Sequence, residues 1–108
     1  MRILLDECVP WPLARLLVGN RCSSPHKLGW DGIQNGALLK LAEAEFDLFI
    51  TSDQNLRYQQ NLSGRKIAIL ELSSNDWHSI QADRERIQQA VAIISPGDFI
   101  HHAVPVIG

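Results

Sequence analysis

The sequence predicts one α/β domain over residues 1–108, with a three-layer, mostly parallel central sheet between helices. Apolar runs too short for helices alternate along the chain with longer segments of helical periodicity. That alternation is typical of parallel sheets. The length of 108 residues corresponds to a single domain, and no repeat or low-complexity stretch divides it.

The first half of the chain contains two expected strands and two expected helices. Residues 2–6 (RILLD) form a short apolar run, which predicts a central strand. Residues 10–20 start with prolines that suit a first helical turn and end with Gly-Asn, which suits a helix end. Residues 21–26 predict a weaker strand, which Pro25 either places at an edge or ends, because proline cannot donate a ladder hydrogen bond. After a glycine-rich loop, Asn35 is expected to cap a helix over 36–46.

The second half continues the alternation. Residues 47–51 (DLFIT) and 66–72 (KIAILEL) are apolar and predict two further strands. Between them, residues 53–64 predict a shorter helix that ends at a glycine. Residues 73–94 start with capping residues and then carry apolar residues at helical spacing, so we expect one helix there. Residues 98–104 (DFIHHAV) predict a last strand.

The composition indicates an ordinary globular protein, with 45% hydrophobic and 20% charged residues. A net charge of −2 argues against a protein that coats nucleic acid through bulk charge, although an enzyme that binds a short piece of it is still compatible. No segment approaches the roughly 20 apolar residues that span a bilayer, and no signal peptide is recognisable. Cys8 and Cys22 lack metal-site spacing, so we expect buried, reduced thiols in a cytoplasmic protein.

Two carboxylates stand just beyond two expected strands, Asp6 and Asp53. In α/β sheets, sites gather at the carboxyl ends of the strands. If these two strands are neighbours, both carboxylates face one crevice, where they repel each other unless a cation intervenes. A hard ion such as Mg²⁺ or Mn²⁺ removes that cost. Taken singly, each acid is also explained as a helix cap.

Three blocks of the sequence resemble the signature blocks of the short PIN-like domains, and the first and third carry these acids: ILLDECVP (3–10), LGWDGIQNGALLKLA (28–42) and LFITSDQNL (48–56). Those domains are similar to the PIN-domain ribonucleases that act as toxins in toxin–antitoxin pairs. The resemblance covers about residues 1–72 in order and spacing. It implies a Rossmann-type fold, an endoribonuclease that needs Mg²⁺ or Mn²⁺, RNA as substrate and a small cognate antitoxin protein as partner.

Carried over by position, Asp6 and Glu7 match the first acidic pair of the family, and Thr51 and Asp53 match its third block. The resemblance therefore implies that Asp6, Glu7 and Asp53 are catalytic. It also implies that Asp6 and Asp53 are the principal metal ligands.

Three positions depart from the family pattern. Cys8 stands where the family favours Asn, Asn35 where it usually has Asp, and Asn55-Leu56 where it has Asp-Phe. An amide oxygen of Asn35 or Asn55 can still coordinate a hard cation but brings no negative charge, so metal affinity should fall. We expect either a weakened nuclease or a PIN-like scaffold that has lost catalysis and binds RNA or a protein partner. Helix capping explains both asparagines as well.

The residues expected to bind substrate flank the proposed crevice in the sequence: Thr51, Ser52, Lys27, Arg57 and Trp30. The basic side chains of Lys27 and Arg57 can hold an RNA backbone, although a solvated surface explains them better. Trp30 can stack an unpaired base or cover the edge of the core.

Two other functions are disfavoured. A serine hydrolase lacks support because no Gly-x-Ser-x-Gly elbow is present. A response-regulator phosphoacceptor also places acids at strand ends, but it needs a late lysine, and KIAILELSS ends without one. Trp11 and Trp77 are expected in the core or against a partner, and a homodimer is a further expectation.

Overall fold

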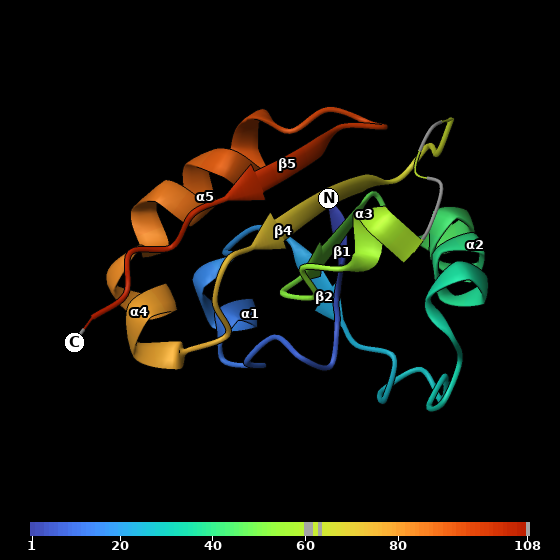
Figure 1. Cartoon of the computed structure of the whole chain (residues 1–108), viewed down its shortest axis with the longest axis horizontal. Helices are drawn as coiled ribbons and strands as arrows, with labels where there is room; N and C mark the ends of the chain where they lie inside the picture. The colour runs from blue at the N-terminus through green and yellow to red at the C-terminus, as the bar shows by residue number, and fades with distance from the viewer. Residues whose placement is uncertain (60–61, 63, 108) are drawn as a thin grey trace.

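The computed structural model describes residues 1–59, 62 and 64–107, which form one sheet of five strands. The strands are β1 (Arg2–Leu5), β2 (Arg21–Ser23), β3 (Leu48–Thr51), β4 (Ala68–Leu72) and β5 (Phe99–His102). All four pairings are parallel, and the order across the sheet is β2-β1-β3-β4-β5 (Figure 1). The expected α/β class with a parallel central sheet is confirmed.

Helices cover both faces of this sheet. They are α1 (Leu13–Leu16), α2 (Asn35–Glu45), α3 (Leu56–Gln59), α4 (Trp77–Ala82) and α5 (Arg84–Ile93). Helices α1, α4 and α5 pack on one face, and α2 and α3 pack on the other (Figure 1). None of the helices that the described residues form has the length and apolar character that crossing a bilayer requires.

The core consists of two apolar clusters, one on each side of the sheet. Because successive strand residues point to opposite faces, Leu5 and Ile50 join one cluster while Leu4 and Phe49 join the other. All four side chains are at most 1% exposed. Burial on both faces is the reason that these strands are continuous apolar runs in the sequence.

The single helix expected over 73–94 is wrong, because the chain forms α4 and α5 with a break at Asp83. The Asp83 carboxylate is buried at this break. It accepts from Arg86 at 3.2 Å and lies 2.7 Å from Nε2 of His102 on β5. The break therefore aims a carboxylate at the edge strand, which the apolar periodicity of the segment cannot reveal.

Other boundaries also differ from the expectations. Gln34, with an extended backbone, occupies the cap position of α2, so Asn35 is its first helical residue rather than its cap. The helix expected over 53–64 begins only at Leu56, and positions 60, 61 and 63 of that range lie outside the described residues. Of the helix expected over 10–20, only α1 forms after the prolines.

Asp76 caps α4, and its carboxylate supports a pH-dependent prediction. The Ser79 hydroxyl and amide donate to Oδ2 at 2.7 and 3.0 Å, which lowers the pKa of Asp76 below its usual value. The unfolded chain therefore binds this proton more readily, so the stabilisation is present at neutral pH and is lost as the pH falls through the lowered pKa. We expect Asp76→Ala to lower the melting temperature more at neutral pH than near pH 2.5. Equal losses in thermal melts at both pH values would contradict this.

Candidate functional site

The site expected at the strand ends lies where the order of strands reverses. The chain places β2 on one side of β1 and then returns to place β3 on the other side. In open α/β sheets, ligands bind outside the carboxyl ends of the strands at such a reversal. Asp6 directly follows β1, and Asp53 comes two residues after β3 ends at Thr51. The structure thus brings both predicted acids to the β1–β3 junction.

Thr51 connects the two acidic residues. Its buried hydroxyl donates to Oδ2 of Asp6 at 2.8 Å. The hydroxyl oxygen, Oγ1 of Thr51, accepts from the main-chain N–H of Asp53 at 3.0 Å. The amide of Asp6 also donates to the carbonyl of Ile50 at 2.9 Å, which extends the β1–β3 pairing by one bond. One hydroxyl therefore holds both residues in position at the end of these strands.

Each carboxylate also accepts a local main-chain hydrogen bond. Oδ1 of Asp6 accepts from the amide of Glu7, and Oδ1 of Asp53 accepts from the amide of Asn55, both at 2.9 Å. These bonds are of the kind that caps and turns use. Asp53 is not the cap of α3, which begins at Leu56. Each carboxylate therefore accepts a turn-forming hydrogen bond, while the Thr51 hydroxyl contacts the carboxylate of Asp6 and the main chain of Asp53.

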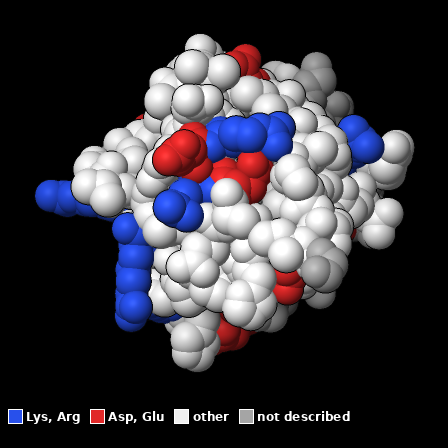
Figure 2. Space-filling model, turned by 90° about the vertical axis from the view of Figure 1, so that its left-hand side faces the viewer, with Lys and Arg blue, Asp and Glu red and all other residues white. Residues whose placement is uncertain are grey.

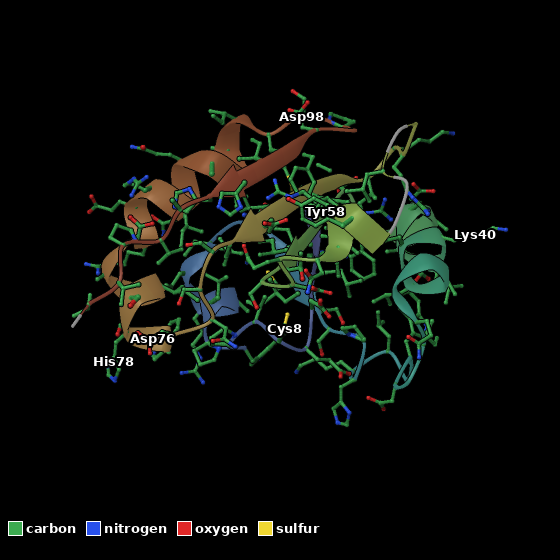
Figure 3. All side chains as sticks on the ribbon, in the orientation of Figure 1. Cys8, Lys40, Tyr58, Asp76, His78 and Asp98 are labelled. Carbon is green, nitrogen blue, oxygen red and sulfur yellow. The ribbon has the colours of Figure 1, made fainter. Side chains whose placement is uncertain are left out.

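Cys8 belongs to this site, although we expected a buried thiol. It is exposed, and its Sγ lies 3.5 Å from Oδ2 of Asp6 and 3.7 Å from Oγ1 of Thr51. The Ser52 amide donates to Sγ at 3.4 Å, and the Ser52 hydroxyl donates to the Cys8 carbonyl at 3.4 Å. Figure 3 shows Cys8 on the segment that follows β1. By contrast, Cys22 is partly buried, which raises the pKa of its thiol.

The donor set fits the kind of Mg²⁺ site that uses one or two carboxylates together with substrate phosphates and water. Asp6 and Asp53 would supply the carboxylates. Within residues 1–59, 62 and 64–107, no group of three or more His, Cys, Asp or Glu is arranged to hold a metal ion. Asn55 is exposed, and the side chain of Asn35 lies outside the described part of the structure. An ion at this site would therefore depend on water and on phosphate oxygens for its other ligands.

A pocket of about 410 Å³ opens beside Asp6. Its polar and aromatic lining consists of Asp6, Glu7, Trp11, Ser24, His26, Lys27 and Asp31. The Lys27 ammonium lies 4.4 Å from the centre of the Trp11 ring, and Nδ1 of His26 lies 3.1 Å from Oδ1 of Asp31. Two of the expected catalytic residues and Lys27 thus share one cavity.

Two other expected substrate-binding residues make contacts within the protein. Trp30 packs against the apolar cluster beneath α2 and meets Phe46 edge-to-face, with ring centres 6.3 Å apart. Of its two expected roles, the structure thus shows the one at the edge of the core. The Arg57 guanidinium lies over the rings of Tyr58 and Phe99, at 5.0 and 5.9 Å. Neither residue is among the residues that line the pocket.

Glu71 and His101 continue the row of polar residues across the sheet, and our sequence reasoning missed them. Thr51 is in register with Glu71, which is in register with His101. The Glu71 side chain is fully buried, and its Oε1 lies 2.7 Å from Nδ1 of His101. Its Oε2 is buried without a hydrogen-bond partner in the described part of the chain. An acid near the end of the apolar run KIAILEL is the same signal that identified Asp6, and it could have identified Glu71.

This pair leads to a stability prediction. A buried oxygen without a partner costs free energy, so replacing the buried Glu71 carboxylate together with its exposed partner His101 by apolar residues removes that cost. We expect the double variant Glu71→Leu/His101→Leu to be at least as stable as the native protein in urea unfolding. Glu71→Ala alone should be less stable, because it leaves a cavity and an unpaired imidazole. A double variant less stable than Glu71→Ala would contradict this account.

Comparisons with protein-family models, curated proteins and solved structures found no match to this chain. The resemblance to the PIN-like domains therefore rests on the three sequence blocks around Asp6, Asn35 and Asp53. Its functional implications are proposals.

Proposed function

We propose that the protein is a metal-dependent endoribonuclease of the PIN type, with weak metal affinity in the absence of RNA. One observation carries the proposal: the Thr51 hydroxyl is hydrogen-bonded both to the Asp6 carboxylate and to the Asp53 main chain at the strand reversal. This contact holds the main chain of Asp53 beside the Asp6 carboxylate, and a metal ion shared by the two acids requires this proximity.

The roles follow from position and charge. Asp6 and Asp53 would hold Mg²⁺ or Mn²⁺, and Glu7, which borders the pocket beside Asp6, would be a supporting catalytic carboxylate that does not coordinate the ion. A bound ion would orient the attacking water and stabilise the charge that develops on the phosphate. Thr51 is a positioning residue, because it acts through Asp6. Asparagine at positions 35 and 55 leaves this set less negative than the family pattern.

Acidic and basic side chains lie together on the face at the carboxyl ends of the strands. Figure 2 views the side towards which the β4 and β5 arrows point in Figure 1. Acidic side chains lie in a hollow near the middle of this face, and basic side chains lie around them. The carboxylates of the proposed site alone would repel RNA, so a bound cation and Lys27, which lines the pocket beside Asp6, would both contribute to binding.

The test is cleavage of a fluorescently labelled single-stranded RNA. We expect cleavage with Mn²⁺ or Mg²⁺ and none with EDTA. Mn²⁺ should also raise the melting temperature, and Asp53→Asn should remove that increase. Cleavage that persists in EDTA, or an absence of cleavage with either ion, would overturn the proposal.

A binding module without turnover is the second candidate, and one observation favours it. Both carboxylates already accept local amides, and the Cys8 thiol contacts Oδ2 of Asp6. These bonds compete with a metal ion for the same oxygens. Such a module would still bind RNA or a protein partner but would cleave no RNA with any divalent ion.

For either candidate, a small antitoxin partner, a homodimer and a cytoplasmic location are predictions that follow from the resemblance and the composition.

Restoring an acid provides a gain-of-function prediction. Asn55 adjoins the site, because its main-chain N–H donates to Oδ1 of Asp53. We expect Asn55→Asp to tighten Mn²⁺ binding by about tenfold, because a charged ligand offsets the dehydration of the ion better than an amide does. Titration calorimetry measures this, and Gln89→Glu on the exposed surface of α5 is the control for charge. An equal gain in both variants would show a general charge effect only.

A further inference from the structure

We propose that the pocket beside Asp6 is a base-binding subsite, which takes one unpaired nucleobase with an exocyclic amine and stacks it on Trp11. This inference rests on the proposed function, because it supposes that the ligand is single-stranded RNA. It adds a position at which the protein would select among bases. It also assigns the stacking role to Trp11 rather than to Trp30.

The pocket has a suitable size and position. Its volume of about 410 Å³ lies within the range of small-ligand sites, roughly 300–1,000 Å³. Asp6 and Glu7 belong both to its wall and to the proposed catalytic set. A base held here would therefore belong to a nucleotide next to the phosphate at Asp6 and Asp53.

Trp11 is held as a platform. It lies between Pro10 and Pro12, whose rings restrict the backbone, and its carbonyl accepts from the amide of Ala14 at 2.9 Å. One part of the ring packs against the core, and the residue also lines the pocket. Lys27 lies 4.4 Å over the ring, so a flexible side chain covers an aromatic face. An arriving base could take the place of this ammonium, which would then be available to a phosphate.

The charges of the pocket select the type of ligand. Three acids, Asp6, Glu7 and Asp31, face two basic side chains, His26 and Lys27. His26 is already close to Asp31, at 3.1 Å. This excess of carboxylates disfavours a phosphate and favours a neutral group that donates hydrogen bonds. Guanine, cytosine and adenine carry exocyclic amines that donate to carboxylates, whereas uracil lacks one.

The experiment follows the indole N–H signals of the three tryptophans by ¹⁵N NMR in EDTA, where the proposed enzyme cannot cleave. Trp11→Phe removes one signal and thereby assigns Trp11. The probes are the pentanucleotides UUGUU, UUCUU and UUUUU. We expect the Trp11 signal to shift with the first two and to shift far less with the third.

The variants test the individual contacts. Trp11→Leu retains apolar packing but removes the aromatic platform, so it should weaken binding of UUGUU by roughly tenfold, while Trp11→Phe should retain most of the affinity. Lys27→Ala should make the slope of log binding constant against log salt concentration less steep by about 0.7. Lys40→Ala is the matched control, since Lys40 is exposed on α2 and points away from the sheet (Figure 3). It should leave binding unchanged.

Three results would overturn the subsite: a Trp11 signal that no probe shifts, equal affinity for all three probes, or native affinity in Trp11→Leu. Failure of the proposed nuclease is distinguishable from these results. RNA cleavage without dependence on Trp11 would remove the subsite only. Base-selective binding through Trp11 without cleavage under any metal would remove the nuclease and leave the subsite.

Discussion

Asp6→Asn is expected to reduce Mn²⁺-dependent RNA cleavage by at least about a hundredfold while the protein stays folded. The native carboxylate accepts the Thr51 hydroxyl at 2.8 Å on one oxygen and the Glu7 amide at 2.9 Å on the other. The substituted side chain keeps one carbonyl oxygen, which can still accept from the Glu7 amide, and its NH₂ group can donate to the Thr51 hydroxyl oxygen. It cannot supply the charge that compensates Mg²⁺ or Mn²⁺ for the water it releases. The measurements are single-turnover cleavage rates at saturating Mn²⁺ and the melting temperature in EDTA.

The matched control is Asp98→Asn. Asp98 is exposed in the turn before β5, at the amino end of that strand, and its carboxylate accepts from the Ser95 amide at 2.8 Å (Figure 3). The charge change is the same, and the residue lies away from the carboxyl ends of the strands. We expect native cleavage rates in this variant. Undiminished cleavage in Asp6→Asn would show that Asp6 has no part in metal binding, and the proposed site would be wrong.

Asp83→Ala is expected to cause the largest loss of stability, about 3 kcal/mol, because it leaves His102 buried without its partner. The two side chains are 5% and 9% exposed, and Oδ2 of Asp83 lies 2.7 Å from Nε2 of His102. The bond ties the break between α4 and α5 to β5. For a domain of this size, the melting temperature should fall by more than about 10 °C.

Two further variants isolate the cause. Arg86→Ala removes only the 3.2 Å contact of a half-exposed guanidinium, so its effect should be below about 1 kcal/mol. The double variant Asp83→Ala/His102→Leu should recover part of the loss, because no buried imidazole lacks a partner in it. If the double variant is less stable than Asp83→Ala, the pair is not the source of the stability.

The parts of the fold that depend on one-dimensional pattern were predictable. Burial on both sheet faces produces continuous apolar runs, so the central strands and the parallel sheet followed from the sequence. The meeting of Asp6 and Asp53 at one junction also followed, because parallel strands end at the same edge. The Thr51 contact bears out the proximity of these residues. It leaves their role in metal binding to experiment.

The features that depend on contacts between distant segments could not be predicted from the periodicity of apolar residues. The break at Asp83 depends on His102, which is 19 positions away. The pocket brings Trp11 under Lys27 from a different loop, so periodicity could not distinguish this tryptophan from Trp30. Glu71 was missed for another reason: the strand-end rule applied to it and was not used.

The strand order has a consequence for when the proposed site forms during folding. Thr51 and Asp6, which meet across β1 and β3, are 45 positions apart. Closing so long a loop costs more entropy than the shorter connections elsewhere in the sheet, so this pairing should form late during folding. A nascent or partly folded chain would then lack the assembled acids. For the proposed nuclease, such a delay would protect cellular RNA from the unfinished polypeptide.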